Sequence, residues 1–284
     1  MKLYWLASYP KSGNTWMRIF LNNYWEDGDQ PYDINALGRT PALYTREFFD
    51  DVLNVESALL TYDEIDRLRP TFHRAYADIL TDWNGQFCKV HDAFERLSDG
   101  TPIFPPDVTS AVIYIIRNPL DVAISYAHHN VVTVDETIAM MGDDNHALSM
   151  FPNTQSHQLH QRLRTWSNHV LSWVDQSDML PVVVVRYEDM LTQPLETFGR
   201  VVQAIEWECD LARLEKAIRF SSFKELKNQE RERGFYEKPR SAESFFRKGE
   251  ADNWRSVLTP LQVERICADH GAVMARFGYL PLPS

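Results

Sequence analysis

The sequence predicts an α/β fold in which helices flank a central parallel sheet. Residues 111–116 (AVIYII) and 181–185 (PVVVV) are continuous apolar runs, which are typical of strands covered on both faces. A helix signal follows each run, and strands that alternate with helices form parallel sheets. We therefore expect residues 1–284 to form a single domain.

The expected strands are short, and polar turns or helical segments separate them. The first lies almost at the N-terminus, and the second is short. In chain order, the four strands are expected at residues 2–7, 87–91, 111–116 and 181–185.

The expected helices carry apolar residues at helical spacing. The helix after residues 111–116 begins with an N-cap at Asn118 and a proline at the first helical position, Pro119. The apolar stripe of residues 159–174 predicts a helix that faces the core. The helices are expected at residues 15–24, from 119 onward, at 159–174 and at 195–205.

Composition is that of an ordinary globular protein, with 44% hydrophobic and 24% charged residues. The net charge of −11 argues against broad electrostatic binding to nucleic acid or to an anionic membrane. No apolar run is long enough for a signal peptide or a membrane span, so we expect a cytoplasmic protein. Residues 26–85 and 131–157 lack a regular pattern, and we expect irregular segments that shape a pocket.

Cysteines and histidines do not predict a metal site. The cysteines Cys88, Cys209 and Cys267 are widely spaced without a C-x-x-C pattern, so we expect reduced thiols. Several histidines could suggest a ligand cluster, but no carboxylate or cysteine pattern accompanies them. These histidines are His128, His129, His157 and His160.

The loop after the first strand has the features of an anion site. Residues 8–16 (SYPKSGNTW) join a strand to a helix, and N–H groups at a helix N-terminus attract anions. Lys11 adds a full positive charge. The loop is not a Walker A sequence, because Lys11 precedes Gly13 instead of following the last glycine. The alternative is a capped helix with a surface lysine.

The segment after residues 111–116 carries a second anion-binding signal. Residues 117–125 (RNPLDVAIS) leave the carboxyl end of a strand, where ligands collect in parallel sheets. Arg117 can grip a phosphate with two N–H groups, and Ser125 lies two turns into the helix. The alternative is an ion pair between Arg117 and Asp121.

A third basic motif lies near the C-terminus, at residues 247–255 (RKGEADNWR). Taken alone, such a charge run is most often a solvated surface. The larger segment 227–255 is polar and contains Gly234, Pro239 and Gly249, so we expect a mobile lid that closes over an anionic ligand.

These three motifs, in this order and spacing, resemble the signature set of sulfotransferases of the cytosolic, small-molecule type. That family uses 3′-phosphoadenosine 5′-phosphosulfate (PAPS) as donor, and the resemblance spans nearly the whole chain. SYPKSGNTW resembles the 5′-phosphosulfate loop, RNPLDVAIS the 3′-phosphate motif, and RKGEADNW the C-terminal RKGxxGDW segment. It implies a P-loop NTPase-like sulfotransferase fold, with PAPS as co-substrate, PAP (3′-phosphoadenosine 5′-phosphate) as product and no metal.

The resemblance also implies a role for each motif residue. The 5′-phosphosulfate would be held by Lys11, Ser12, Gly13, Asn14 and Thr15. The 3′-phosphate would be held by Arg117, Ser125, Arg247, Lys248 and Gly249. Adenine would be sandwiched by Trp16, Tyr187 and Phe223, with Ser221 close by; the alternative for these aromatics is the protein core.

The catalytic base is expected on the second strand, where residues 89–91 (KVH) look like the family's Lys-Thr-His. Side chains on a strand alternate, so Lys89 and His91 share one side. His91 would take the acceptor's proton in an in-line transfer, because a neutral imidazole can accept a proton at cellular pH. Lys11 and Lys89 would stabilise the charge that develops on the leaving and equatorial oxygens.

The expected activity is transfer of the sulfuryl group to a hydroxyl of a small-molecule acceptor. Two alternatives stay open: a nucleotide-dependent kinase on the same fold, and a nucleotide-binding module without catalysis. The sequence departs from the family at Asp252, where glycine is usual, and in the dimer motif, where Arg255 and Pro260 replace lysine and valine. We therefore expect a monomer or a weak dimer.

Overall fold

The computed structural model describes most of the chain, which divides into two compact units. The described residues are 3–37, 43–80, 87–151, 154–239 and 242–281. Unit 1 contains residues 1–9, 40–114 and 143–184, and unit 2 contains residues 10–39, 115–142 and 185–284.

A central parallel sheet of four strands, flanked by helices, confirms the predicted fold class. The strand order is β2-β1-β3-β6, and Leu6 of β1 lies opposite Lys89 of β2 in a parallel register. All four predicted strands are present, with ends that differ from the predictions by at most two residues. The strands are β1 (Leu3–Ser8), β2 (Phe87–Val90), β3 (Thr109–Ile116) and β6 (Val182–Arg186).

The strand order explains where a ligand site can form. The chain runs from β1 to β2 on one side and then to β3 on the other side of β1. In parallel sheets, ligands bind outside the carboxyl ends of the strands where the order reverses. The loop after Ser8 and the segment after Ile116 leave the sheet from the ends of β1 and β3.

Unit 1 places helices against strands of the sheet. The ring of His73 on α3 lies 4.8 Å from the ring of Trp5 on β1, and His169 Nδ1 on α6 lies 2.8 Å from the Tyr114 hydroxyl on β3. These helices and the short antiparallel strands of unit 1 are α2 (Arg46–Leu53), α3 (Tyr62–Ile79), α6 (Trp166–Val174), β4 (Ala147–Leu148) and β5 (Gln161–Arg162), with 3₁₀ turns at Ser57–Leu59 and Pro106–Val108.

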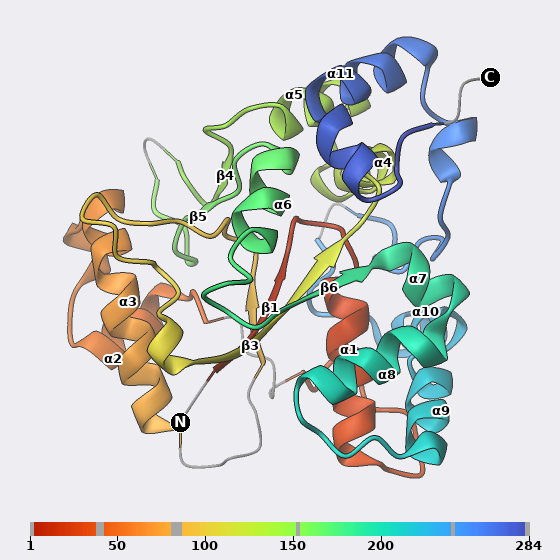
Figure 1. Ribbon diagram of the computed structural model, residues 1–284, viewed down its shortest axis with the longest axis horizontal. Helices are drawn as coiled ribbons and strands as arrows, with labels where there is room; N and C mark the ends of the chain where they lie inside the picture. The colour runs from red at the N-terminus through yellow and green to blue at the C-terminus, as the bar shows by residue number, and fades with distance from the viewer. Residues whose placement is uncertain (1–2, 38–42, 81–86, 152–153, 240–241, 282–284) are drawn as a thin grey trace. The chain divides into compact units, whose positions relative to one another are not determined.

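Unit 2 is helical. Helices α1, α8 and α9 lie side by side, and α4, α5 and α11 form a second group (Figure 1). Phe20 of α1 stacks on Phe198 of α8 with ring centres 4.0 Å apart. The helices are α1 (Asn14–Glu26), α4 (Pro119–Asn130), α5 (Val134–Met141), α7 (Tyr187–Thr192), α8 (Pro194–Ala204), α9 (Leu211–Phe220), α10 (Phe223–Arg233) and α11 (Pro260–Arg276), with a 3₁₀ turn at Asn253–Ser256.

The helix predicted at residues 159–174 is wrong in its first half, because α6 begins only at Trp166. Leu159 and Leu163 are buried as predicted, but their N–H groups donate to the carbonyls of Tyr44 and His146, not to a helical turn. Thr165 then caps α6 by accepting from the N–H of Asn168. Buried residues at helical spacing therefore arose here from an extended segment joined to a helix.

The expectation that residues 26–85 and 131–157 are irregular is also wrong, because they contain α2, α3 and α5. Helix α3 is 18 residues long and begins with a capping box, in which Thr61 and Glu64 satisfy each other's N–H groups. Thr133 and Glu136 do the same for α5. Both boxes are legible as S/T-x-x-E in the sequence.

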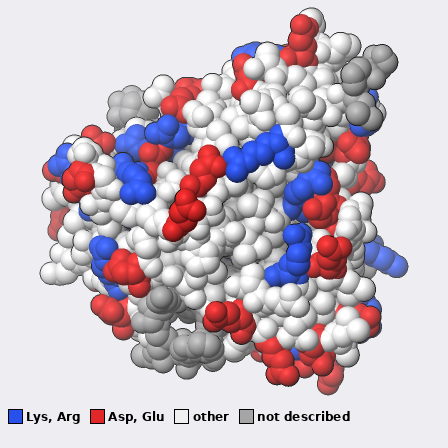
Figure 2. Space-filling view, viewed as in Figure 1, with Lys and Arg blue, Asp and Glu red and all other residues white. Residues whose placement is uncertain are grey.

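Charges of both signs are interspersed on one face of the molecule. On the face shown in Figure 2, Lys and Arg side chains alternate with Asp and Glu side chains. A positive site for an anion must therefore be local. Among the described helices, none combines the length and apolarity that crossing a membrane requires.

Candidate functional site

The loop before α1 forms an anion-attracting helix end. Lys11 and Gly13 have positive φ angles of 69° and 106°, and Gly13 is the N-cap of α1 without a side-chain cap. The first turn of α1 has no acidic residue to neutralise the helix dipole. Ser12 is fully buried, and within the described structure its hydroxyl has no hydrogen-bond partner. A buried hydroxyl left in that state costs about 1–3 kcal/mol, which an anion's oxygen could offset.

Gly13 is required by the close approach of a neighbouring ring. A Cβ at this position would lie 2.7 Å from Cδ2 of Tyr187, in addition to the cost of its positive φ. The loop backbone therefore rests on the aromatic ring that opens α7.

Arg117 joins all three sequence motifs. Its Nη1 donates to the carbonyl of Lys11 and its Nη2 to the carbonyl of Glu250, each at 3.1 Å. The guanidinium lies 4.2 Å from the ring centre of Tyr187. Its Nε is buried and has no hydrogen-bond partner in the described part of the chain, so one N–H remains for a ligand.

Asp121 accepts hydrogen bonds from the backbone of the C-terminal motif, and the described structure has no hydrogen bond between Asp121 and Arg117. Its two carboxylate oxygens accept the N–H groups of Asp252, at 2.8 Å, and Trp254, at 3.1 Å. Asp252 takes a left-handed conformation with φ 60°, so the turn forms although glycine is usual there in the family that this sequence resembles. Burial raises the pKa of Asp121, against the pull of Arg117 and these N–H groups.

Several basic groups face one another in unit 2. Burial lowers the pKa of Arg247, and the positive charge of Arg117 lowers it further against Glu250 and Asp121. Burial likewise lowers the pKa of His128, with Arg247 and Lys248 adding to the shift. Like charges held this close repel one another. A polyanion bound among them would relieve that repulsion.

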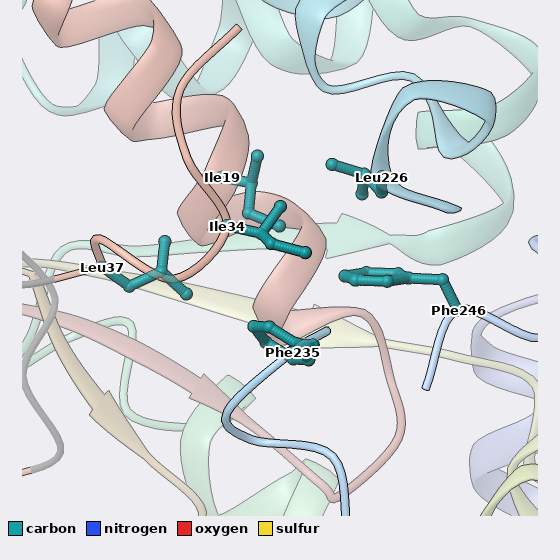
Figure 3. Close-up of a cluster of buried hydrophobic side chains, with 6 residues drawn as sticks. All are labelled: Ile19, Ile34, Leu37, Leu226, Phe235 and Phe246. Atoms are coloured by element: carbon teal, nitrogen blue, oxygen red, sulfur yellow. The ribbon is translucent and has the colours of Figure 1, made fainter. Parts of the chain in front are cut away.

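Gly249 fits between these cations and an aromatic side chain. Its φ is 66°, and a Cβ would overlap the ring of Phe223. Phe223 packs against a buried cluster that Phe246 joins from the C-terminal segment, and Figure 3 shows the six core members. The cluster consists of Ile19, Ile34, Leu37, Leu226, Phe235 and Phe246.

The three aromatics expected at adenine lie in one region of unit 2. The rings of Trp16 and Tyr187 are 5.7 Å apart at 70°, and Trp16 Nε1 donates to the carbonyl of Ser221 at 2.8 Å. Trp16 and Phe223 are half-buried, whereas Tyr187 is only 6% exposed. The Tyr187 ring therefore packs against Gly13 and the guanidinium of Arg117, as a core aromatic would.

The remaining expected ligands of the nucleotide differ in how they are engaged. Asn14 and Thr15 begin α1 and are buried. Lys248 Nζ donates to Asn253 Oδ1 at 2.6 Å, and the Ser221 hydroxyl donates to the Ala217 carbonyl. Ser125 is half-buried on α4, and no hydrogen bond joins it to Arg117 in the described structure.

Lys11 points toward two residues that the sequence did not single out as its partners. Its Nζ lies 3.3 Å from Nδ1 of His129 and 4.4 Å from the ring centre of Phe245. An ammonium only donates, so Nδ1 of His129 is the acceptor in this contact. Within the described chain, no three His, Cys, Asp or Glu side chains are grouped to hold a metal ion.

In unit 1, the position of His91 fixes which nitrogen can accept a proton. Its Nδ1 lies 2.8 Å from the carbonyl oxygen of Ser8. A carbonyl only accepts, so Nδ1 carries the hydrogen and the lone pair of the neutral ring is on Nε2. Lys89 is half-buried on β2, two residues before His91.

The main chain of His91 is also held from both sides. Its N–H donates to Gln161 Oε1 at 3.0 Å, and its carbonyl accepts from His169 Nε2 at 3.0 Å. Burial lowers the pKa of His169 to about 4, so its ring is neutral and its Nδ1 accepts from the Tyr114 hydroxyl. Sequence reasoning missed Gln161 and His169, because their role depends on main-chain contacts that no motif encodes.

The segment predicted to be a lid is more apolar and more regular than expected. Residues through Arg233 continue helix α10, and Phe235, Phe246 and Trp254 are buried. The expectation that residues 227–255 are a polar segment with little to pack is therefore wrong at these three residues. Whether they move on binding stays a prediction.

The chain belongs to the sulfotransferase domain family, whose sequence profile matches residues 2–278. Among curated relatives, dog sulfotransferase 1A1 is 25% identical over 96% of this chain and 83% of its own length. Dog sulfotransferase 1B1 is 28% identical over 92% and 79%, and Arabidopsis thaliana cytosolic sulfotransferase 13 is 27% identical over 92% and 73%.

Two solved structures have a similar fold. Mouse sulfotransferase SULT7A1 complexed with PAP has a TM-score of 0.59 at 18% identity, covering 96% of this chain and 85% of its own. Retinol dehydratase in complex with retinol and PAP has a TM-score of 0.61 at 17% identity, covering 99% and 83%. At these identities, the likeness supports the fold.

Proposed function

We propose that this sulfotransferase transfers the sulfuryl group of PAPS to a hydroxyl of a small-molecule acceptor, with His91 as general base. One observation in unit 2 carries the nucleotide part of the proposal. Arg117 joins the loop before α1 to the C-terminal motif, and its charge adds to the effect of burial in lowering the pKa of Arg247. Its buried Nε has no hydrogen-bond partner among the described residues. This arrangement suits a ligand with several negative groups.

The residues present fit such a donor. The buried hydroxyl of Ser12, the N-terminus of α1 and Lys11 would hold the 5′-phosphosulfate, together with Gly13, Asn14 and Thr15. The 3′-phosphate would lie with Arg117, Arg247, Lys248, Gly249 and Ser125. Adenine would contact Trp16 and Phe223, with Tyr187 and Ser221 behind them. That PAP is bound in the mouse sulfotransferase and in retinol dehydratase supports this choice of nucleotide.

The bound donor supplies an activated sulfuryl group, and side chains of this protein move the proton and stabilise the developing charge. Nε2 of His91 accepts the proton of the acceptor hydroxyl as the oxygen bonds to sulfur. The bond from sulfur to the bridging oxygen breaks, and PAP leaves with that oxygen and the electron pair. Lys11 and Lys89 stabilise the negative charge on the leaving and equatorial oxygens. The proposed reaction needs no metal.

The proposed acceptor class rests on the relatives. Retinol in the dehydratase structure is a small molecule with a hydroxyl, and the curated relatives are named as sulfotransferases. We propose a small hydroxyl-bearing acceptor for this chain as well. We also place the protein in the cytoplasm, in keeping with the name of the cytosolic Arabidopsis relative, and expect a monomer or weak dimer.

The decisive experiment is incubation of the purified protein with PAPS and a mixed panel of phenols and alcohols, with PAP release as the readout. Acceptor-dependent PAP release is expected. Binding of PAP and ADP is compared in parallel by calorimetry, and PAP should bind far more tightly because only PAP has a 3′-phosphate. Tighter binding of ADP would favour a kinase, and PAP binding without turnover on any acceptor would favour a module that only binds.

A further inference from the structure

Arg69 on α3 is a fully buried cation in unit 1 with three different partners. Its side chain is 0% exposed. Nε donates to Asp66 Oδ1 at 3.0 Å, Nη1 donates to Asp92 Oδ2 at 3.4 Å, and Nη2 donates to the carbonyl of His160. The guanidinium also lies 4.5 Å from the ring centre of Tyr44. Desolvating a charge is costly, so a cation this buried needs all its partners in place.

Two of these partners belong to the segments that carry His91 and its main-chain acceptor. Asp92 follows His91 directly, and the His160 carbonyl precedes Gln161, whose Oε1 accepts the N–H of His91. Arg69 is therefore a clamp on both segments at once. A single guanidinium can serve them because it presents its donors in a rigid fork.

The two segments are joined to each other as well. The N–H of Arg162 donates to Asp92 Oδ1 at 3.1 Å, and the N–H of Ala93 donates to the Arg162 carbonyl at 2.7 Å. Arg162 Nε reaches Asp66 Oδ2 at 2.9 Å, so two guanidiniums and two carboxylates alternate around the junction. With the N–H of His91 on Gln161, these bonds tie residues 91–93 to residues 160–162.

We propose that Arg69 is a positioning residue for His91, which it orients by holding residues 160–162 against residues 91–93, with Asp92 as its countercharge. The proposal rests on the proposed function, because it takes His91 as the base. In this role Arg69 acts through the segments that hold His91, and it is not one of the proposed ligands of the donor. Gln161 links Arg69 to His91. Its Oε1 accepts the N–H of His91, and its two neighbours are held by Arg69 and Asp92, at the carbonyl of His160 and the N–H of Arg162.

The charge of Asp92 is consistent with this role. Burial raises the pKa of Asp92 to about 7, while the attraction of Arg69 opposes the shift. Without that attraction, burial would raise the pKa of Asp92 further still. Replacing Arg69 by lysine therefore removes the fork of hydrogen bonds to Asp92 and to the carbonyl of His160, while a positive charge stays beside Asp92.

The test compares Arg69→Lys with Arg74→Lys. Arg74 lies on the same helix and also makes a two-bond contact with a carboxylate, Asp107, but its side chain is 45% exposed. We expect Arg69→Lys to lower kcat roughly 10- to 100-fold, the size of effect that a misplacement of about 1 Å produces. PAP affinity should stay within about twofold, since the proposed PAP ligands all lie in unit 2. Arg74→Lys should leave both quantities unchanged.

Nitrogen NMR of the His91 ring supplies a readout that does not depend on turnover. The wild type should show a hydrogen on Nδ1, and Arg69→Lys a mixture of tautomers. An Arg69→Lys protein with the kcat of Arg74→Lys and an unchanged His91 spectrum would overturn the proposal, as would equal losses of kcat and PAP affinity. If Arg69→Lys does not fold, Gln161→Ala decides: an unchanged His91 spectrum there would remove the link. Wild type without sulfuryl transfer would refute the proposed function, while the spectra would still report on the positioning.

Discussion

Nδ1 of His91 and the carbonyl oxygen of Ser8 lie 2.8 Å apart, which leaves Nε2 as the only ring nitrogen able to accept a proton. His91→Ala should therefore lower kcat by roughly 10²- to 10⁴-fold, the contribution of a general base. PAP affinity should be nearly unchanged. Single-turnover assays with saturating PAPS measure the effect, and activity within a few-fold of wild type would remove His91 from that role.

Arg117→Ala should weaken PAP far more than adenosine 5′-phosphosulfate, because only PAP has a 3′-phosphate. Part of the loss will be shared by both nucleotides, since Arg117 also holds the carbonyls of Lys11 and Glu250. Arg186 is a matched control, because it lies over the ring of Tyr279 at 4.8 Å as Arg117 lies over Tyr187. Titration calorimetry on Arg117→Ala and Arg186→Ala, with each nucleotide, measures the two affinities. Equal weakening of the two nucleotides by Arg117→Ala would restrict Arg117 to a structural role.

Gly249→Ala should weaken PAP binding and Gly278→Ala should not. Both glycines have positive φ angles, 66° and 72°, so alanine is strained at either by about 1–3 kcal/mol. Only at Gly249 would the new Cβ overlap a side chain, that of Phe223, whereas at Gly278 it would meet nothing within 4 Å. Similar PAP dissociation constants for the two variants would show that the contact with Phe223 does not shape the site.

Sequence patterns predicted the sheet well because its strands are covered on both faces, so continuous apolar runs such as residues 111–116 mark them directly. The same logic failed at residues 159–165. Leu159 and Leu163 are as buried as helix residues would be, yet Arg164 has φ 58° and the backbone pairs with other segments. Periodicity reports burial, and it cannot report which backbone partner each N–H finds.

The candidate site shows the same division between local and distant information. The charged motifs predict Arg117 and Arg247 as anion-binding residues, because an anion site needs cations. The partners that orient these groups are distant in sequence. Asp121 reaches Asp252, and His129 with Phe245 reaches Lys11. No spacing rule joins such pairs.

Stability should fall between pH 6.5 and pH 4 as buried histidines become protonated in the unfolded chain. Burial lowers the pKa of His169 to about 4, so the unfolded state binds the proton first and the stabilisation present above pH 6.5 is lost as pH falls. For His169 alone, the loss between pH 7.5 and pH 5 is about 2 kcal/mol. Urea denaturation of wild type and His169→Gln at these two pH values isolates this contribution. An equal pH dependence in the two proteins would contradict it.

Hydrogen exchange should show that residues 227–255 respond to PAP in part only. Through Arg233, the segment is helix α10, and Phe235 and Phe246 are buried in the cluster of Figure 3, so this portion should be protected before PAP is added. The N–H groups of Phe245 and Phe246 also donate to the carboxylate of Glu230, at 2.6 and 2.9 Å.

Residues 247–253 differ, because the charge of Arg117 repels Arg247 and Gly249 has a positive φ. PAP should order this stretch by pairing those cations with phosphate, and closure would exclude water that competes with the acceptor as nucleophile. Exchange measured by mass spectrometry with and without PAP should therefore change most at residues 247–253, and Arg247→Ala should abolish most of that change. Gly234→Ala is a control for backbone strain within the same segment, because Gly234 has φ 73° and a Cβ there would meet nothing within 4 Å. Full protection of residues 247–253 before PAP is added, with no change afterwards, would establish a fixed wall in place of a closing segment.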